Sequence, residues 1–278
     1  MEAGKWAPIL DIRGELVLSA VTIKLTRLPL IWLYGNATLT NAEIRDSSAT
    51  ILHVKSGAAC ALLSAVSVSR LTAPLLQLSP TEFFDRSFQV HISASKFEDN
   101  QAWPLLHLTT LPGIVTITNS TFARNRMTAY PSYNSLILRF RDCAFTGNRD
   151  TIVHAMQLTN AEISIANCTF AGNRDAAFYV RRFTGLFRFQ DSQVTQQELG
   201  GVLYQLNDWN EAGPCTVDFL HSTITHINAT VSALHQVHAI HVYKCPAYIA
   251  DLTITNVSLI AAPAFIHDSV LAGFFTVL

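Results

Sequence analysis

A segment of about 25 residues recurs along this chain, and no other feature restricts its fold as strongly. Residues 142–150 read DCAFTGNRD, and residues 167–175 read NCTFAGNRD. The shared core, Phe-x-x-Asn, also begins at Phe97 and at Phe122. A repeat of this length, rich in β-forming residues and without helical periodicity, predicts a solenoid in which each repeat is one coil.

The repeat can be extended in both directions by taking the Phe as a reference position. The residue five places before the reference is apolar in every segment, and the residue two places before it is small. Because parallel strands lie about 4.8 Å apart, equivalent side chains of successive coils should stack into ladders. The sequence therefore predicts an all-β, single-stranded parallel β-helix of about ten coils. The ten reference positions are Ile23, Ile44, Leu71, Phe97, Phe122, Phe145, Phe170, Val194, Ile224 and Leu259.

Two polar positions accompany the reference. The residue three places before it is often Asn or Asp, which suits a turn with a left-handed backbone. The residue three places after it is Asn in four consecutive coils, which predicts a second polar column. The first set comprises Asn41, Asn119, Asp142, Asn167, Asp191 and Asn256, and the second comprises Asn100, Asn125, Asn148 and Asn173.

These coils resemble known proteins. The Phe-x-x-Asn segments at Phe97, Phe122, Phe145 and Phe170 are similar to repeats of bacterial polymorphic outer-membrane proteins. The pattern over residues 16–270 resembles the pectin-lyase-like superfamily of right-handed β-helices. This resemblance implies that the coils wind in the right-handed sense, and that any enzymatic activity would act on polysaccharides.

Composition restricts the partners. Apolar residues make up 49% of the 278 residues and charged residues 14%, which is enough apolar material for a continuous core. Lys and Arg number 19 against 20 Asp and Glu, so the formal net charge is -1. Without a basic field, we expect no nucleic-acid partner and no attraction to anionic lipid.

The repeat covers the chain as one domain, residues 1–278, with wider spacings that predict loop insertions near residues 206–214 and 235–245. The N-terminal residues lack the pattern of a secretory signal. Residues 258–278 are apolar but contain Pro, His and Asp, so we expect buried strands there instead of a membrane segment. The apolar C-terminal end indicates a piece of a longer protein with neighbouring domains.

Asp150 and Asp175 are the best catalytic candidates, and they are weak ones. They lie one coil apart, so their carboxyl groups could approach to about 5 Å, the spacing of a retaining glycosidase. Each follows an arginine, Arg149 or Arg174, and such repeated Arg-Asp turns more often form a solvated row of ion pairs. No nucleophile elbow or glycine-rich phosphate loop is present. The chain is therefore predicted to be a non-enzyme.

The histidines do not form a metal site in this interpretation. His53, His107 and His154 recur two coils apart, about 10 Å, which is too far to share one ion. A second set lies on one strand, where alternation sends the middle residue to the opposite face. We expect no metal and no cofactor. The second set is His235, His238 and His241 with Cys245.

A stripe of aromatic, imidazole and amide side chains is the candidate binding surface. These residues alternate with apolar ones that should face inward, so they should face outward and stack from coil to coil. Such a flat stripe could stack on sugar rings or pack against another protein, and the alternative is a face that is merely solvated. The members are Trp32, His53, Gln77, His107, His154 and Tyr179.

Two covalent features remain as alternatives. Cys143 and Cys168 occupy equivalent places in adjacent coils, so they could form a disulfide or remain as stacked buried thiols. Five Asn-x-Ser/Thr glycosylation motifs occur, but three of them coincide with the turn position of the repeat. Only Asn36 and Asn228 are independent indications of glycosylation.

The leading hypothesis is a non-enzymatic β-helix of a cell-surface or extracellular protein. It would serve as an adhesin-like scaffold that binds glycan or protein along its flank or loops. One alternative is a polysaccharide lyase or glycoside hydrolase with the pectin-lyase-like fold, which the resemblance suggests. Another is a purely structural spacer.

Overall fold

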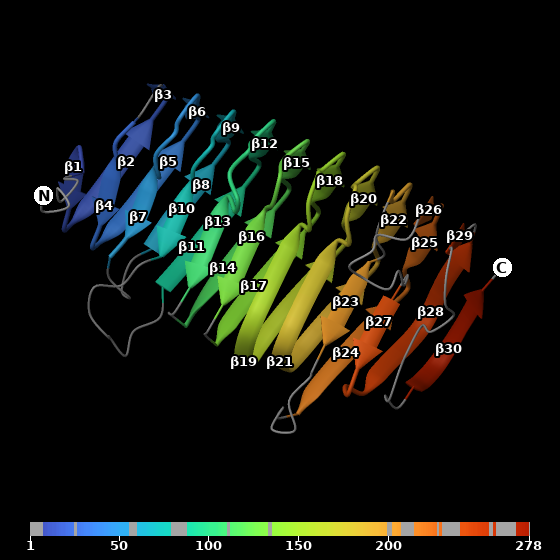
Figure 1. The fold of residues 1–278 in the computed structure, drawn as a ribbon. Coiled ribbons are helices and arrows are strands. Elements are labelled where there is room, and N and C mark those ends of the chain that lie inside the picture. Colours follow the sequence, from blue (N-terminus) through green and yellow to red (C-terminus); the bar gives the residue numbers. More distant parts are fainter. Residues whose placement is uncertain are drawn as a thin grey trace, which may run out of the picture.

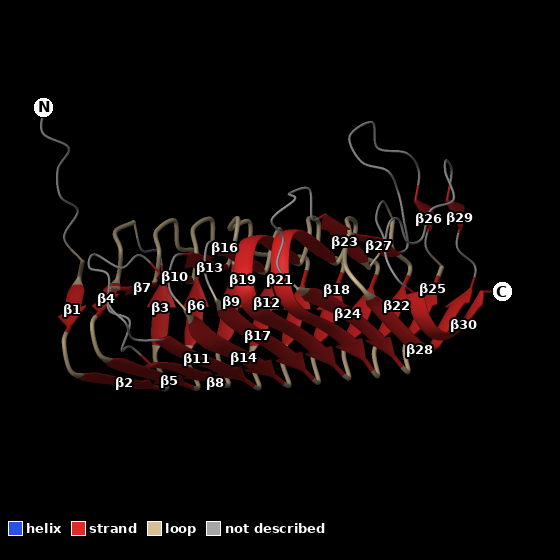
Figure 2. Cartoon of the chain, turned by 90° about the horizontal axis from the view of Figure 1, so that it is seen from below, coloured by secondary structure: helices blue, strands red, loops and turns tan. Residues whose placement is uncertain are grey.

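A computed structural model shows the chain as a long stack of short strands (Figures 1 and 2). Among the described residues there is no helix, and hence none that is long and apolar enough to cross a membrane. The described residues are 8–24, 27–55, 60–78, 88–109, 112–132, 135–198, 202–206, 214–226, 228–229, 240–255, 258–259 and 271–277.

Each coil contributes strands to three parallel sheets, which we name by their character. The long-strand sheet contains β2 (Glu15–Ser19), β5 (Asn36–Thr40), β8 (Cys60–Ser64), β11 (Phe88–Ser93), β14 (Gly113–Thr118), β17 (Leu136–Arg141) and β24 (Cys215–Leu220). The three-residue sheet contains β3 (Thr22–Lys24), β6 (Glu43–Arg45), β9 (Ser67–Ser69), β12 (Lys96–Glu98), β15 (Thr121–Ala123), β18 (Ala144–Thr146), β20 (Thr169–Ala171), β22 (Gln193–Thr195) and β25 (Thr223–Thr225).

The third sheet, the aromatic sheet, carries the candidate binding residues. It contains β1 (Leu10–Ile12), β4 (Ile31–Leu33), β7 (Leu52–Val54), β10 (Leu76–Leu78), β13 (Leu106–Thr109), β16 (Ala129–Ser132), β23 (Leu203–Leu206) and β27 (Ile240–Tyr243). Some strands continue around a corner from one sheet into the next: β19 (Val153–Ala166), β21 (Phe178–Gln190) and β28 (Ala247–Thr255). Beyond these, β30 (Leu271–Val277) pairs with β28, and β26 (Asn228–Ala229) pairs with β29 (Ser258–Leu259).

The phenylalanine references stack in a single interior column, as predicted. Phe97 pairs in register with Phe122, Phe122 with Phe145, and Phe145 with Phe170. Their ring centroids are 4.6, 5.0 and 4.8 Å apart, and all four rings are buried and nearly parallel. The predicted class, an all-β parallel β-helix, is therefore confirmed.

Two reference positions were assigned wrongly. Val68, and not Leu71, pairs with Ile44 and Phe97. Ile254, and not Leu259, continues the column above Ile224, whereas Leu259 pairs with Ala229. Both segments have apolar residues in two alternative frames, so the apolar pattern alone could not select the correct one.

The turn residues adopt the left-handed backbone that the Asn/Asp pattern predicted. The residue three places before the reference has a positive φ even where it is Ala or His, because the corner requires it in every coil. Asn256 lies outside the described residues, and Asp251 takes the turn position below Ile254. The positive-φ residues at this corner are Ala20, Asn41, Ala65, Ala94, Asn119, Asp142, Asn167, Asp191, His221 and Asp251.

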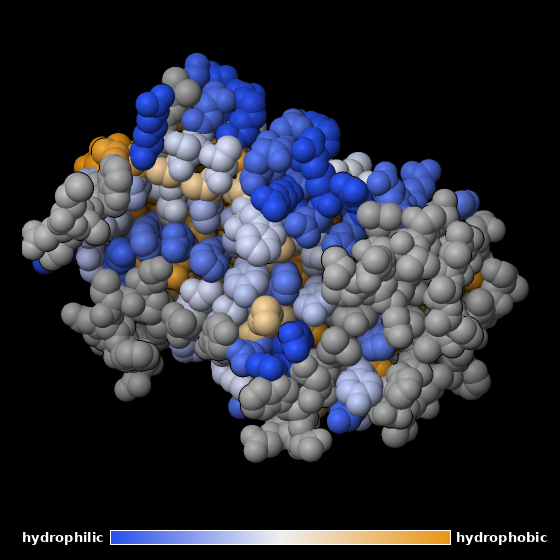
Figure 3. Space-filling model, viewed as in Figure 1, coloured by the Kyte–Doolittle hydropathy of each residue, from blue (hydrophilic) through white to orange (hydrophobic). Residues whose placement is uncertain are grey.

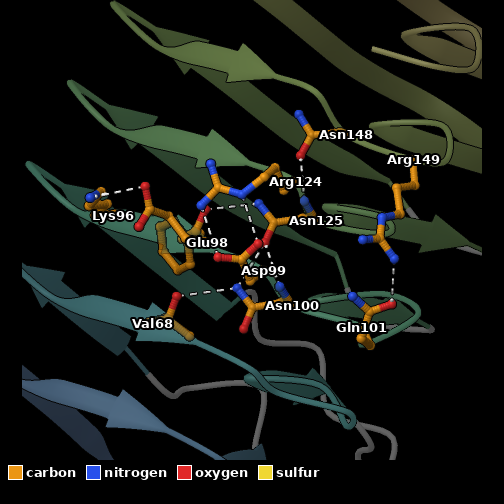
Figure 4. A network of polar contacts seen from close by, with 11 residues as sticks. Val68, Lys96, Glu98, Asp99, Asn100, Gln101, Arg124, Asn125, Asn148 and Arg149 are labelled. Atoms are coloured by element: carbon orange, nitrogen blue, oxygen red, sulfur yellow. Dashed lines mark hydrogen bonds and ion pairs between the residues drawn. The ribbon is translucent and has the colours of Figure 1, made fainter. Parts of the chain in front are cut away.

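The predicted second polar column is a buried asparagine ladder (Figure 4). Asn100, Asn125, Asn148 and Asn173 are 2% exposed or less. Asn148 Nδ2 donates to Asn173 Oδ1 at 2.8 Å and to the Phe122 carbonyl at 3.0 Å. Because these amides satisfy buried backbone groups in the neighbouring coils, they hold the coils in register.

The small residues before the reference form a second interior ladder. Ser120 Oγ donates to the Thr118 carbonyl at 2.8 Å and accepts from the Ser95 N–H at 3.1 Å, so one hydroxyl satisfies two coils. Cys143 and Cys168 occupy the same column, and both are buried. Residues 207–213 and 235–239 of the predicted loop regions lie outside the described residues. The second prediction is wrong at residues 240–243, which form the strand β27.

Candidate functional site

The predicted binding stripe is a continuous column on the outer side of the aromatic sheet. The middle residue of each three-residue strand points outward between two buried neighbours, as in β4, β7 and β10. Register pairs connect successive members, for example His53 with Gln77 and Gln77 with His107. We call this set the aromatic column: Trp32, His53, Gln77, His107, Tyr130, His154 and Tyr179.

Neighbouring rings of the aromatic column contact each other mainly edge to face. Ring centroids are 5.7 Å apart for His107 and Tyr130, 5.4 Å for Tyr130 and His154, and 4.6 Å for His154 and Tyr179. Trp32 and His53 are 6.5 Å apart, with planes at 82°. All these rings are half-buried. This sheet faces the viewer in Figure 3, where pale side chains of intermediate hydropathy cross the middle of the molecule.

Tyr130 was missed by the sequence prediction. It sits in the coil between His107 and His154, and a buried alanine precedes it. The spacing could have revealed it, because each residue of the aromatic column follows the reference position of its coil by eight to ten residues. The spacing is not constant, since the turn before the strand varies in length. Register extends the column to Tyr204 and His241 in β23 and β27, where His241 is buried.

The histidines of the column are held neutral. Burial lowers the pKa of His53 from 6.5 to about 4, with smaller contributions from the charges of Lys55 and His107. Burial also lowers the pKa of His107 and of His154, and the latter decrease is opposed by the carboxylates of Asp150 and Asp175. At neutral pH these rings therefore present hydrogen-bonding and stacking surfaces without charge.

Two cations pack on aromatic rings at the N-terminal end of the aromatic column. Lys55 Nζ is 4.7 Å from the centroid of the Trp32 ring, and Arg13 Cζ is 5.7 Å from that of Tyr34. Lys55 is buried and Arg13 is exposed. Trp32 Nε1 and His53 Nε2 are buried without a hydrogen-bond partner. This end of the column therefore combines aromatic surface with unsatisfied polar groups.

Asp150 and Asp175, the weak catalytic candidates, take part in turn hydrogen bonds. Asp150 Oδ1 accepts from the Thr151 N–H at 2.9 Å, and Asp175 Oδ1 accepts from the Ala176 N–H at 2.8 Å. Thr151 Oγ1 is 3.4 Å from Asp175 Oδ2, and Arg126 lies 3.8 Å from Asp150. These contacts give both carboxylates a structural role in the turns.

Cys245, which the sequence places with the second histidine set, is not available as a metal ligand. Cys245 forms a disulfide with Cys215, and this removes its thiolate as a ligand. His235 and His238 lie outside the described residues. Within the parts of the chain that the structure describes, no group of three potential ligands is arranged to hold a metal ion.

The disulfide joins a different pair from the one considered above. Cys143 and Cys168 are free buried thiols that donate to the carbonyls of Arg141 and Ala166, both at 3.2 Å. Each thiol therefore bonds to the carbonyl two residues before it, as the serine hydroxyls of this ladder do. The Cα atoms of Cys215 and Cys245 are 5.4 Å apart.

One glycosylation candidate can be placed. Asn36 is exposed at the start of β5, and its Oδ1 accepts from the Cys60 N–H at 3.2 Å. Asn228 begins the short strand β26 and pairs with Ser258 of β29. The side chain of Asn228 lies outside the described part of the structure.

Comparison with known proteins agrees with this architecture. A family model described as a right-handed beta helix region matches residues 29–217, which is more than half of the chain. Neither a curated protein nor a solved structure matches the chain significantly.

Proposed function

The chain belongs to the family of right-handed β-helix proteins, and we propose that it is a non-enzymatic scaffold that binds carbohydrate along its aromatic column. One observation carries this proposal. Rings from consecutive coils, including Tyr130, His154 and Tyr179, form a half-exposed row on one flat sheet. Aromatic faces bury large apolar surfaces and keep a polar edge, which suits the apolar faces and hydroxyl groups of sugars.

A surface or extracellular location fits the same proposal. A disulfide between Cys215 and Cys245 is typical of oxidising compartments, and Asn36 presents an exposed glycosylation motif. A cell-surface protein could use a stack of this length to carry its binding face away from the membrane. Detection of the protein on intact cells by an antibody that cannot enter them would test this location, and an exclusively internal signal would contradict it.

Carbohydrate binding can be tested with matched aromatic variants. We expect Tyr130→Ala and Tyr179→Ala each to weaken binding to a responsive polysaccharide by about tenfold, the loss expected for one stacking contact. Tyr248 is exposed on the long-strand sheet, so Tyr248→Ala is the control and should bind as the unmodified protein does. Binding would be measured by calorimetry or a glycan array. Equal affinities in all variants would contradict the proposal.

A polysaccharide-cleaving enzyme is the second candidate, favoured by one observation. Asp150 lies in the turn before β19, which carries His154, and Thr151 Oγ1 in the same turn is 3.4 Å from Asp175 Oδ2, so two carboxylates and an imidazole lie near one another beside the column. The test is turnover of polysaccharides, with and without calcium. Cleavage that disappears in Asp150→Asn or Asp175→Asn, while folding is retained, would replace the scaffold proposal with this one.

A further inference from the structure

Lys55 is a buried lysine for which the described residues provide no anionic partner. The residue is 9% exposed, and its Nζ lies over the face of Trp32, 4.7 Å from the ring centroid. Lysine is rarely buried without a counter-charge, because desolvating an ammonium group is unfavourable. Burial accordingly lowers the pKa of Lys55. A contact with an aromatic ring compensates only part of this cost.

The unsatisfied polar atoms beside Lys55 lie on adjacent coils. Trp32 and His53 pair in register, and Lys55 follows His53 by two residues, so its side chain leaves on the same side of the strand. Trp32 Nε1, which can only donate, and His53 Nε2 are both buried without a partner. Each such group costs free energy until a hydrogen-bond partner reaches it, and for the indole N–H that partner must be an acceptor.

The neighbouring coil adds a second cation and a second ring. Leu33 pairs in register with Val54, which places Tyr34 beside Lys55, and Arg13 packs on Tyr34 from the preceding coil. The carboxylate nearest in register is that of Asp11, which is exposed and lies opposite Trp32. The described residues at this end of the column therefore include two cations and one exposed carboxylate.

We propose that Lys55, Arg13 and the indole N–H of Trp32 form a subsite for an oxyanion, a carboxylate or sulfate group, carried by the bound ligand. The ammonium, guanidinium and indole groups donate to the oxyanion, while Trp32 and Tyr34 contact the ring that carries it. Binding satisfies the buried ammonium and turns an unfavourable group into a specificity determinant. The subsite rests on the proposed function in one respect: the ligand that carries the oxyanion is taken to be a sugar.

The unmodified protein provides the first test. The indole ¹⁵N–H resonance of Trp32, assigned with Trp32→Phe, is followed at constant ionic strength during titration with glucuronate, glucose 6-sulfate, glucose and inorganic sulfate. We expect a saturable shift with the anions and little or none with glucose. A stronger response to glucuronate or to the sulfate ester identifies which oxyanion is preferred. An indole resonance that no anion shifts would overturn the subsite.

Variants with a matched control provide the second test. Lys55→Met keeps an unbranched apolar side chain, shorter by one atom, and removes its charge, and we expect it to bind the preferred anionic sugar at least tenfold more weakly. Lys244 also packs on an aromatic ring, that of Tyr243 at 5.1 Å, but it is exposed, so Lys244→Met should change nothing. Unchanged affinity in a folded Lys55→Met would overturn the subsite, and if that variant fails to fold, the titration decides.

These outcomes separate the two proposals. If glucose and glucuronate bind equally and Tyr179→Ala weakens both, the carbohydrate scaffold stands and the oxyanion subsite is wrong. If inorganic sulfate shifts the Trp32 resonance but no sugar binds, the subsite stands and the carbohydrate scaffold is wrong.

Discussion

Single residues in this protein act through their copies in the neighbouring coils. Asn148 illustrates this, because its backbone N–H donates to Asn173 Oδ1 while its own Oδ1 accepts from the Asn125 N–H. An amide at this position satisfies backbone groups that would otherwise be buried without partners. The sequence predicted this column from repeated Asn residues, but the repeat alone did not show that the amides point into the core.

We expect Asn148→Ala to lower the free energy of unfolding by about 2–4 kcal/mol, because it leaves the Asn125 N–H and the Phe122 carbonyl buried without their partners. The measurement is the midpoint of urea denaturation, read by far-UV circular dichroism. Arg149 is the next residue and is exposed, so Arg149→Ala should leave the midpoint nearly unchanged. Equal effects of the two substitutions would contradict the role of the ladder.

His53 should make stability depend on pH. Its pKa falls from 6.5 to about 4 on folding, so the unfolded chain binds a proton more readily than the folded protein does. The stability is fully present above about pH 6.5 and is lost progressively as the pH falls toward 4. Urea midpoints measured between pH 7 and pH 4 should therefore decline less in His53→Gln than in the unmodified protein. Parallel curves would show that His53 is not the cause.

At the scale of elements, the three-residue strands were predictable and their exact frame was not. Phe rings and Asn residues occur together in the coils from Phe97 to Phe170, so only one frame satisfied both patterns there. Neither marks the coil of Val68, where Leu71 occupies the Asn position and donates its backbone N–H to Asn100 Oδ1 at 3.0 Å. Most members of the aromatic column could be predicted because they follow their reference residues at a nearly constant spacing. Tyr130 was missed because the turn before its strand is shorter.

The Cys215–Cys245 disulfide shows a limit of reasoning from repeats. Cys143 and Cys168 lie one repeat apart and are free, whereas the bonded pair is separated by a coil of 30 residues that contains an insertion. Wherever the coil length varies, equivalent positions cannot be counted along the sequence. Only the register of β24 with β28, seen in the pairing of Val217 with Ala247, brings these two cysteines together.

Removing this disulfide should destabilise the C-terminal coils. A cross-link that closes a loop of this length contributes about 2–4 kcal/mol. We expect Cys215→Ser with Cys245→Ser to raise the rate of limited proteolysis within residues 203–255, with smaller effects on earlier coils. Cys60 is free, so Cys60→Ser serves as the control. A uniform increase in cleavage along the chain would show that the bond supports the whole stack and not these coils alone.

At the scale of the whole molecule, stability should vary along the stack, because a coil contacts only its neighbours. The inward side chains Leu16, Leu18 and Ile23 of the first coil are partly exposed, whereas Leu39 and Ile44 in the next coil are fully buried. Local opening should therefore be easiest in the first coil. Hydrogen exchange read by mass spectrometry should show faster exchange in peptides covering 15–24 than in those covering 136–146, where the Phe and Asn ladders are continuous. Equal protection in both regions would mean that the stack opens as one cooperative unit, and a substitution in any coil would then lower the stability of all of them.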